Sequence, residues 1–338
     1  MIREALAELV GGHSLSRGLA AEAMLEIMSG EATGAQIGAF VIALRLKGET
    51  VDEVVGLASA MRQKAITIDA GPGLLDTAGT GGDGKASFNV STAAALVASA
   101  AGARVAKHGN RGASSACGSA DVLEALGVAI DLGPAATAAA IRETGFGFLF
   151  APLYHPSMAH AGPVRKELGI RTVFNLLGPL SNPAGAQYQI VGAPDPRIAG
   201  LLAQALCELG CQRALVFNGE DGLDELTVSG KTRIWEVEGG AISNYWVDPL
   251  DWGLARSSLE AIRGGSATVN AEITRGVLEG ESGPRRDVVI LNAAAGLMVA
   301  GMAASWAEGL ALAGEAIDSG RAGVKLGQVI AFGQSRRA

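Results

Sequence analysis

Aromatic residues are scarce in this sequence, making up only 4% of the chain. Charged residues are also few, at 18%, and the formal net charge of −7 leaves no basic surplus. Domains that bind nucleic acid in general usually carry such a surplus, so the composition argues against a nucleic-acid partner. The 49% of apolar residues and the 48 glycines instead indicate a globular protein with a core of Ala, Leu, Val and Ile.

Cysteine is equally rare, and Cys117, Cys207 and Cys211 are its only occurrences. Three cysteines do not make the disulfide framework of a small secreted protein. Cys207 and Cys211 stand four positions apart in a helical pattern and would share one face. Small core residues are favoured there over a pair of metal ligands.

The sequence also lacks a leader and a convincing membrane span. Residues 1–5 carry neither a basic leader nor a long apolar run, so no signal peptide is expected. The apolar run at 288–304 is long enough to cross a bilayer and contains one strongly polar residue, Asn292. Ala and Gly dominate it, however, and they insert weakly. We therefore expect a buried core helix, a cytoplasmic protein and no membrane partner.

The first 69 residues predict a small helical domain. Apolar residues recur there at helical spacing, and one stretch stops at Gly48. Ser16 is placed to cap one helix, and the capping boxes Thr33–Gln36 and Thr50–Glu53 open two others. From residue 70 strands and helices alternate, which is typical of an α/β domain with a mostly parallel sheet, here residues 70–338.

Residues 75–92, LDTAGTGGDGKASFNVST, predict a strand end, a glycine-rich loop and a helix N-terminus. Glycine lets bare backbone N–H groups approach a phosphate, and the helix N-terminus adds its positive dipole end. Gly79, Gly81 and Gly84 match the dinucleotide fingerprint, but the acidic residue that should hold a ribose about 20 positions later is missing. The P-loop pattern fails too, because Ala86 stands where Ser or Thr should hold Mg²⁺. The loop is therefore predicted to bind phosphate in another way.

The window between Asp83 and Asp121 has no acidic residue. Its charged residues are all basic: Lys85, Arg104, Lys107 and Arg111. In a chain of negative net charge, this tract suits a small polyanion. A strand at 103–106 ends in a second polar loop, 107–115, and Ser119 is expected to cap the next helix. Two such loops at the carboxyl ends of neighbouring strands would face one crevice, where open α/β sheets bind ligands.

The later part of the chain supplies one more chemical feature, the carboxylate pair Asp224 and Glu225. Such a pair can bind Mg²⁺ through its oxygens or through water, although alone it is more typical of a solvated turn. Magnesium and a diphosphate together would indicate a transfer reaction with a charged leaving group. The remaining expectations are a loop at 175–183, strand-like segments at 226–237 and 242–247, and helices from there to the end.

Taken together, the motifs resemble the anthranilate phosphoribosyltransferase family over essentially the whole chain. The matching stretches are GTGGDG at 79–84, NVST at 89–92, KHGNR at 107–111, SS at 114–115, GSAD at 118–121, HP at 155–156, VR at 164–165, FNLLGPL at 174–180, DGLDE at 221–225 and LNAA at 291–294. The resemblance implies a nucleoside phosphorylase/phosphoribosyltransferase-like fold, usually a homodimer. It also implies that the small domain is completed by about residues 160–182.

The reaction that this resemblance implies belongs to tryptophan biosynthesis. The amine of anthranilate displaces diphosphate from C1 of 5-phosphoribosyl 1-diphosphate (PRPP), with Mg²⁺ as cofactor, a pair of ions per monomer. An aromatic amine is already neutral at physiological pH, so no residue is assigned as a general acid or base.

The resemblance further implies roles for individual residues. The expected PRPP-binding residues are Gly79, Gly82, Asp83, Ser87, Asn89, Val90, Ser91, Thr92, Lys107, His108, Gly109, Asn110, Arg111, Gly112, Ala113, Ser114, Ser115 and Ser119. The expected anthranilate-binding residues are Gly79, Asn110 and Arg165, with His108 and His155 as walls of the acceptor path. The expected metal ligands are Ser91, Asp224 and Glu225.

Two positions differ from what many relatives carry. Met158 stands where an aromatic residue can occur, which leaves that part of the acceptor wall open. Ser87 replaces a frequent Thr and keeps the hydroxyl.

Two alternative functions stay open on the sequence. A pyrimidine nucleoside phosphorylase would have a similar fold, but it would leave Asn110, Arg165 and the Asp224–Glu225 pair without a role. A non-enzymatic, nucleic-acid-binding relative of the fold would be expected to show a basic surface and eroded motifs. The acidic composition and intact loops count against both.

Overall fold

The computed structural model describes residues 1–112 and 116–337. Ala113, Ser114 and Ser115, which are expected in the PRPP site, lie outside the described residues.

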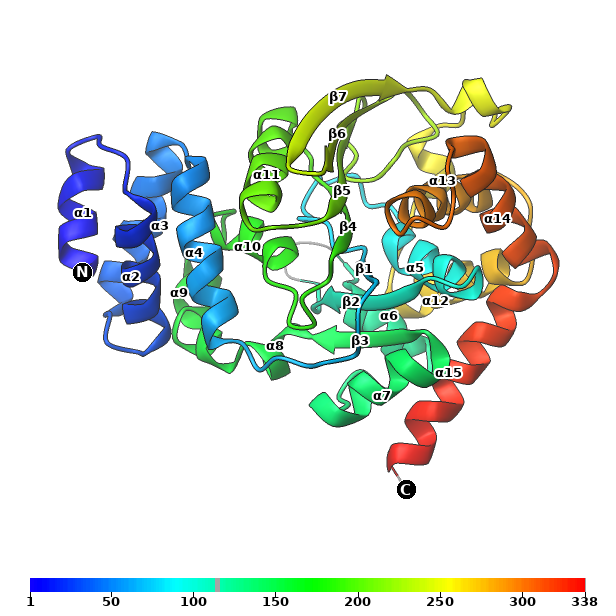
Figure 1. The fold of residues 1–338 in the computed structure, drawn as a ribbon, viewed down its shortest axis with the longest axis horizontal. Helices are drawn as coiled ribbons and strands as arrows, with labels where there is room; N and C mark the ends of the chain where they lie inside the picture. The colour runs from blue at the N-terminus through cyan, green and yellow to red at the C-terminus, as the bar shows by residue number, and fades with distance from the viewer. Residues whose placement is uncertain (113–115, 338) are drawn as a thin grey trace.

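A bundle of helices forms one end of the molecule (Figure 1). It contains α1 (Ile2–Val10), α2 (Arg17–Met28), α3 (Gly34–Lys47) and α4 (Val51–Lys64). The predicted starts are confirmed: Ser16 Oγ accepts from Leu19 N, and both Thr33 and Thr50 form complete capping boxes. Glu53 of the second box is buried, where its carboxylate also accepts from Leu15 N and Lys47 Nζ.

A later segment returns to this bundle. It comprises α8 (Ala151–Tyr154), a 3₁₀ turn (Pro156–His160), α9 (Gly162–Leu168) and α10 (Phe174–Leu180). Residues from Ala161 to Leu180 share a buried apolar cluster with the bundle. The loop expected at 175–183 is wrong, because α10 occupies most of it. Leu176, Leu177 and Leu180 are buried on the side of α4 and α11, and this burial outweighs the helix-breaking signal of Pro179.

The larger part is built on one sheet with strand order β3-β2-β1-β4-β5-β6-β7. The strands are β1 (Leu74–Asp76), β2 (Arg104–Gly109), β3 (Phe146–Phe150), β4 (Tyr188–Gly192), β5 (Arg213–Gly219), β6 (Thr232–Glu238) and β7 (Ala241–Val247). Strands β1 to β5 pair in parallel, and only β6 and β7 join antiparallel. The predicted mostly parallel sheet is confirmed.

The strand expected at 226–237 begins later than predicted. Residues 226–231 are not a strand, because side chains take up their backbone groups. Asn292 accepts from Leu226 N and donates to Leu226 O, and Thr232 Oγ1 accepts from Thr227 N. These bonds replace the ladder that a strand would need.

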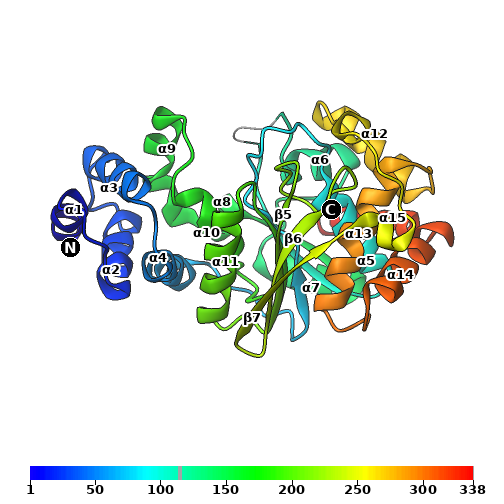
Figure 2. The same ribbon diagram turned by 90° about the horizontal axis from the view of Figure 1, so that it is seen from above.

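Helices cover both faces of the sheet (Figure 2). They are α5 (Val90–Ala100), α6 (Ser119–Leu126), α7 (Pro134–Thr144), α11 (Pro196–Glu208), α12 (Ala267–Leu278), α13 (Pro284–Val299), α14 (Trp306–Asp318) and α15 (Arg321–Arg337). Every residue of α13 from Val288 to Val299 is buried, so the predicted core helix is confirmed. No helix within the described ranges is long and apolar enough to cross a membrane.

Two further expectations need correction. Ser119 is the first residue of α6 and Gly118 is its cap, because the carboxylate of Asp121 accepts from Gly118 N in place of a Ser hydroxyl. The stretch 248–266 is not continuous helix but holds two 3₁₀ turns, Pro249–Trp252 and Leu259–Ile262. Gly253, with φ of 75°, ends the first of them.

Candidate active site

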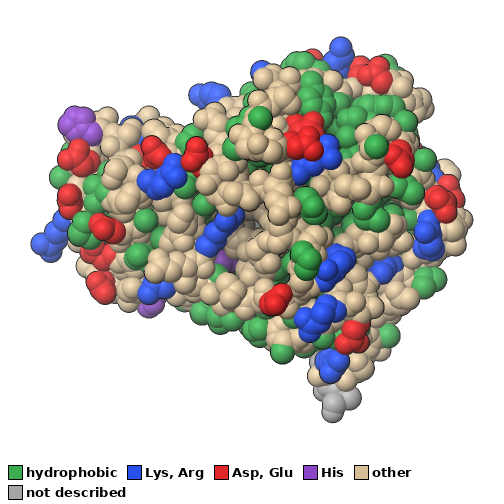
Figure 3. Space-filling view, in the orientation of Figure 1, with side chains coloured by type: hydrophobic (Ala, Val, Ile, Leu, Met, Phe, Trp, Pro, Cys, Tyr) green, Lys and Arg blue, Asp and Glu red, His purple; other side chains and the backbone are tan. Residues whose placement is uncertain are grey.

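Two adjoining cavities lie at the carboxyl ends of β1 and β2, on the edge where the sequence places its two polar loops. The loop cavity, about 290 Å³, is bounded by residues 78–83, 86–89, 91–92, 107–112 and 117–119 and by Asn175, Asp224 and Glu225. The histidine cavity, about 430 Å³, is bounded by His108, His155, Arg165 and neighbours on α8 to α10. The two share the wall residues Ala78, Gly79, Thr80, His108, Gly109, Asn110 and Asn175. A space-filling view shows a hollow between the helical bundle and the sheet domain, with basic and histidine side chains in it (Figure 3).

The glycine-rich loop needs its glycines. Gly81, Gly82 and Gly84 have φ of 65°, 75° and 71°, a region that other residues rarely adopt. Gly79 is constrained by space instead, since an added Cβ would lie 3.3 Å from Gly192 O. Ala86 also has a positive φ, 56°, and its carbonyl accepts from Gly264 N. The loop is therefore held in a fixed, strained shape that leaves its backbone open to the cavity.

The acidic pair lies in the loop cavity and is half-buried, so the interpretation as a solvated turn is wrong. Glu225 Oε1 accepts from Ser91 N at the start of α5, and Asp224 N donates to Asp83 Oδ2. Burial, followed by the nearby charge of Asp83, raises the pKa of Asp224 to about 7. Burial and the charge of Asp224 raise the pKa of Glu225 to about 8. Burial and repulsion both disfavour the ionised form of these carboxylates, and a bound cation would stabilise that form.

The carboxylates of Asp224 and Glu225 are compatible with magnesium. Among the described residues, no group of three or more His, Cys, Asp or Glu side chains is arranged to hold a metal alone. Mg²⁺ does not need such a cage, because it commonly binds through one or two carboxylates and keeps water and substrate phosphate oxygens as its other ligands.

Lys107 places a positive charge in the floor of the loop cavity. Its side chain is only 2% exposed, and Nζ donates to Thr77 O at 3.1 Å, Thr77 Oγ1 at 2.8 Å and Ser91 Oγ at 3.4 Å. Burial lowers the pKa of Lys107, while the charges of Asp76 and Glu225 act in the opposite direction. Thr92 is buried beside it, and its Oγ1 has no hydrogen-bond partner in the described part of the chain. A buried hydroxyl of this kind on a cavity wall is available to a ligand.

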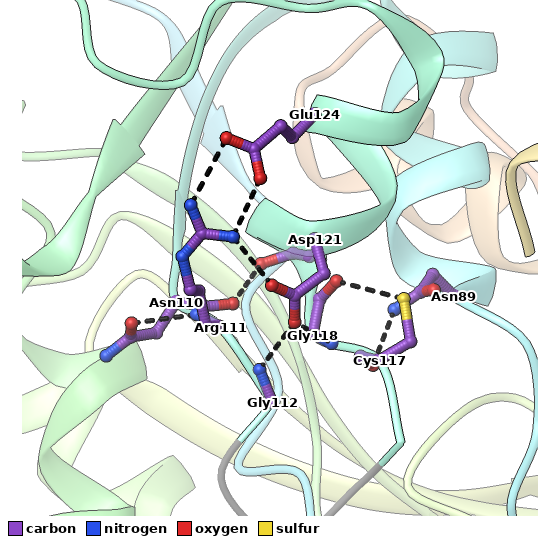
Figure 4. Close-up of polar contacts among 9 residues, drawn as sticks. Asn89, Asn110, Arg111, Gly112, Cys117, Gly118, Asp121 and Glu124 are labelled. Carbon is purple, nitrogen blue, oxygen red and sulfur yellow. Dashed lines mark hydrogen bonds and ion pairs between the residues drawn. The ribbon is translucent and has the colours of Figure 1, made fainter. Parts of the chain in front are cut away.

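Other expected PRPP residues support the wall by bonding to the protein itself (Figure 4). Asn89 Nδ2 donates to Cys117 O, and Asn89 Oδ1 accepts from Asn270 Nδ2. Ser119 Oγ donates to Asn110 O. Asn89 therefore anchors the start of α5 to the neighbouring loop and to α12.

Arg111 turns toward α6 (Figure 4). Its Nη1 lies 2.9 Å from Asp121 Oδ1 and 2.8 Å from Glu124 Oε2. Asp121 Oδ2 also accepts from Gly112 N and Gly118 N. The Arg111 guanidinium thus forms ion pairs with two acids of α6 while its residue borders the loop cavity.

The histidine cavity has a different chemical character. The rings of His108 and His155 lie 5.1 Å apart, and His108 Nδ1 lies 3.0 Å from Gly178 O. Burial lowers the pKa of His108 to about 4 and that of His155 to about 3. Both rings are therefore neutral at physiological pH.

Arg165 supplies positive charge to this cavity. Its guanidinium lies 5.3 Å from the Phe174 ring, and burial lowers its pKa. No carboxylate of the described residues pairs with it. Met158 lines the same cavity.

Sequence reasoning missed several residues that shape the site. Asp76 accepts from His108 N and from Asn182 Nδ2, and burial raises its pKa to about 6. Asn270 fixes Asn89, and Arg171 contacts the glycine-rich loop. Asp121 could have been found, because it is the first acid after the long acid-free window. The others carry no local signal, since their partners lie far away in sequence.

Comparisons with known proteins give this site its context. A model described as "Glycosyl transferase family, helical bundle domain" matches residues 3–65, and "Glycosyl transferase family, a/b domain" matches residues 71–323. An anthranilate phosphoribosyltransferase of Dehalococcoides mccartyi is 51% identical over 337 residues, which is 99% of either chain.

Solved structures agree. The crystal structure of the anthranilate phosphoribosyltransferase of Thermus thermophilus is 47% identical and matches with a TM-score of 0.92, covering 98% of this chain and 99% of that one. The Saccharomyces cerevisiae enzyme in complex with PRPP and Mg is 29% identical, with a TM-score of 0.91 over 99% of this chain and 98% of its own. The yeast enzyme with 4-fluoroanthranilate is also 29% identical, with a TM-score of 0.89 and the same coverage of both chains.

These matches are 47–51% identical and cover nearly the full length of both chains. They favour an anthranilate phosphoribosyltransferase over a nucleoside phosphorylase or a non-enzymatic relative. The chain belongs to the anthranilate phosphoribosyltransferase family, whose members transfer a phosphoribosyl group to anthranilate in tryptophan biosynthesis.

Proposed function

We propose that the chain carries out its family's reaction with PRPP in the loop cavity and anthranilate in the histidine cavity. The observation that carries this assignment is the shared wall at Gly79 and Asn110. It lets C1 of the donor and the amine of the acceptor meet at one boundary, while each substrate keeps a cavity suited to its charge. Holding both reactants at such a boundary supplies much of the barrier lowering in a bimolecular transfer.

The donor is proposed to contact the backbone of the glycine-rich loop, the start of α5, the end of β2 and residues 110–112. The residues that line the loop cavity are Gly79, Gly82, Asp83, Ser87, Asn89, Ser91, Thr92, Lys107, His108, Gly109, Asn110, Arg111, Gly112 and Ser119. Val90 belongs to the same proposal, although its side chain is buried in the apolar core. The unpartnered hydroxyl of Thr92 and the buried ammonium of Lys107 support this most directly. Fixed positive groups in a partly dry cavity stabilise a departing diphosphate because they need no reorganisation.

We propose that Ser91 on one side and Asp224 and Glu225 on the other hold a pair of Mg²⁺ ions per monomer. Both carboxylates border the loop cavity, and burial and repulsion by neighbouring acids raise their pKa values, so a nearby cation would favour the ionised forms. When bound, magnesium supplies charge stabilisation for the leaving diphosphate. The half-buried carboxylates orient the donor and keep its reacting end beside Gly79.

The acceptor is proposed to place its carboxylate on Arg165 and its amine near Gly79 and Asn110. Arg165 has no acidic partner among the described residues, so its charge is free for an anionic substrate. Neutral His108 and His155 and the apolar walls suit an aromatic ring. No side chain is assigned as a base, since the amine attacks in its neutral form.

The assembly and location belong to the same proposal. The small domain is taken as residues 1–69 completed by about 160–182, and a homodimer is proposed through the bundle. Val10 of α1 and Leu46 of α3 are 81% and 82% exposed and would be covered by a second copy. A cytoplasmic location is proposed because a diphosphate carries too much charge to cross a bilayer unaided.

The test is the loss of anthranilate fluorescence when purified protein is mixed with PRPP and Mg²⁺, repeated with EDTA. Magnesium-dependent loss is expected. If fluorescence stayed constant while calorimetry still detected PRPP binding, the assignment of the histidine cavity to anthranilate would be wrong. Light scattering of the same sample would measure the mass, and a monomer would contradict the proposed dimer.

A further inference from the structure

Arg171 reaches from one part of the molecule to the other. It lies between α9 and α10, in the segment that packs on the helical bundle. Its Nη1 donates to Gly81 O in the glycine-rich loop of the sheet domain. A Cβ added at Gly82 would collide with the same guanidinium. The side chain therefore rests directly on the loop that is proposed to receive PRPP.

The guanidinium also lies close to the acidic side of the loop cavity. The charges of Asp224 and Asp83 raise the pKa of Arg171 against the stronger lowering effect of burial. Its Nη2 is buried and has no hydrogen-bond partner in the described part of the chain. The Arg171 guanidinium is thus held by one backbone carbonyl and by nearby charge, and no ion pair within the described residues fixes it.

The segment that carries Arg171 also forms a wall of the acceptor site. Arg165 lies six positions earlier in α9, and Asn175, which borders both cavities, accepts from Thr172 N at 3.0 Å. The bond between Thr172 and Asn175 fixes the chain directly after Arg171. A shift of the glycine-rich loop would therefore be passed through Arg171 to the segment that carries Arg165.

We propose that Arg171 is a positioning residue that holds the glycine-rich loop against the Arg165 segment and so couples donor binding to acceptor binding. The proposal rests on the assignment of PRPP to the loop cavity. It predicts that loss of the guanidinium weakens donor binding and removes the effect of bound diphosphate on anthranilate affinity.

The matched control is Arg45. It lines the same cavity of about 560 Å³ as Arg171. Its charge is close enough to lower the pKa of Arg171, and among the described residues no hydrogen bond or ion pair joins Arg45 to the glycine-rich loop. Arg45→Gln therefore removes a similar charge from the same place without touching the loop.

The experiment uses isothermal titration calorimetry on the full chain with Mg²⁺ present. PRPP is titrated first, and anthranilate is then titrated with and without inorganic diphosphate as an unreactive probe. Arg171→Gln is expected to weaken PRPP binding by at least about tenfold, as for loss of a charged hydrogen bond, with Arg45→Gln within about twofold of the parent. Anthranilate affinity without diphosphate should stay unchanged in both variants, and the diphosphate effect should disappear only in Arg171→Gln.

Arg171→Lys keeps the positive charge but loses the planar guanidinium, and it is expected to recover part of the PRPP affinity. Thermal unfolding of each variant identifies a folding defect, and the Lys variant then provides the test if the Gln variant does not fold. Unchanged PRPP affinity in Arg171→Gln, or an equal loss in Arg45→Gln, would overturn the proposal. Failure of the parent to consume anthranilate would instead count against the proposed function, and the calorimetric comparison for PRPP would still stand.

Discussion

The two cavities meet at Gly79 and Asn110 but are built in opposite ways. The loop cavity is made from backbone groups, a buried ammonium and half-buried carboxylates, and its charges repel or attract one another strongly. The histidine cavity has apolar walls, two neutral imidazoles and one guanidinium without an acidic partner in the described residues. The difference follows the chemistry. The donor loses a highly charged group, so its cavity must stabilise changing charge. The acceptor attacks through a neutral amine, and its carboxylate keeps one charge throughout, so its cavity needs only to select and orient it.

The largest effect is expected from removing the carboxylates of the loop cavity. Asp224→Asn with Glu225→Gln should lower kcat by about 100- to 1,000-fold, the scale for losing one main electrostatic element of a transition state. The measurement is the anthranilate fluorescence assay over a magnesium titration.

Glu220→Gln is the matched control for this pair. Glu220 is an exposed acid of the same turn, and its carboxylate accepts only from Lys231 N among the described residues. It should keep the parent's kcat. Full activity of the double variant at low Mg²⁺ would show that the pair does not serve the metal.

A smaller and more selective effect is expected in the other cavity. Arg165→Gln should raise KM for anthranilate by about 10- to 150-fold, since a hydrogen bond to a charged group contributes about 1.5–3 kcal/mol. KM for PRPP should change little, which would separate the two cavities experimentally. Lys166→Gln, at an exposed position on the same helix, is the control. A rise in KM for PRPP as large as that for anthranilate would show that the two cavities do not bind the two substrates separately.

The histidine cavity should also respond to acid. Burial lowers the pKa of His155 to about 3, so folding keeps it neutral while the unfolded chain takes up a proton near its ordinary value. Its stabilising contribution is therefore complete above about pH 6.5 and is lost as the pH falls. Between pH 6.5 and pH 5 the loss is about 2 kcal/mol in the free energy of unfolding.

The free energy of unfolding is measured by urea unfolding of the parent and of His155→Gln, at pH 6.5 and at pH 5. The raised pKa values of Asp224 and Glu225 act with the opposite sign, because their contribution is lost as the pH rises, so only the difference between the two proteins isolates the histidine. A difference that does not vary with pH would show that His155 is protonated in the folded chain as easily as in water.

The smallest effect is expected at Ser87, which lines the loop cavity. Ser87→Thr keeps the hydroxyl and should change KM for PRPP by less than about twofold, the usual scale for a mild substitution. Ser87→Ala removes the hydroxyl and provides the contrast. If the Thr variant lost more affinity than the Ala variant, space at this position would matter more than the hydroxyl.

Local patterns in the sequence predicted the elements that depend on local physics. Helix starts at Ser16, Thr33 and Thr50 could be predicted because a cap bonds to N–H groups a few residues away. Alternation of strands and helices predicted the parallel sheet. Predictions failed where distant burial decided the outcome, as at α10, or where a distant side chain took up the backbone, as Asn292 does for Leu226.

The same division holds inside the site. The glycine-rich loop, the basic tract and the acidic pair could be recognised from sequence, because backbone freedom and charge are properties of the residues themselves. Only the tertiary structure decided that Arg111 pairs with α6, that Asn89 is held by Asn270 and that Arg171 rests on Gly81. The physical reason is that the direction of a side chain and the burial that shifts its pKa depend on neighbours brought together by folding, often more than 100 positions away in the sequence, as with Asn89 and Asn270.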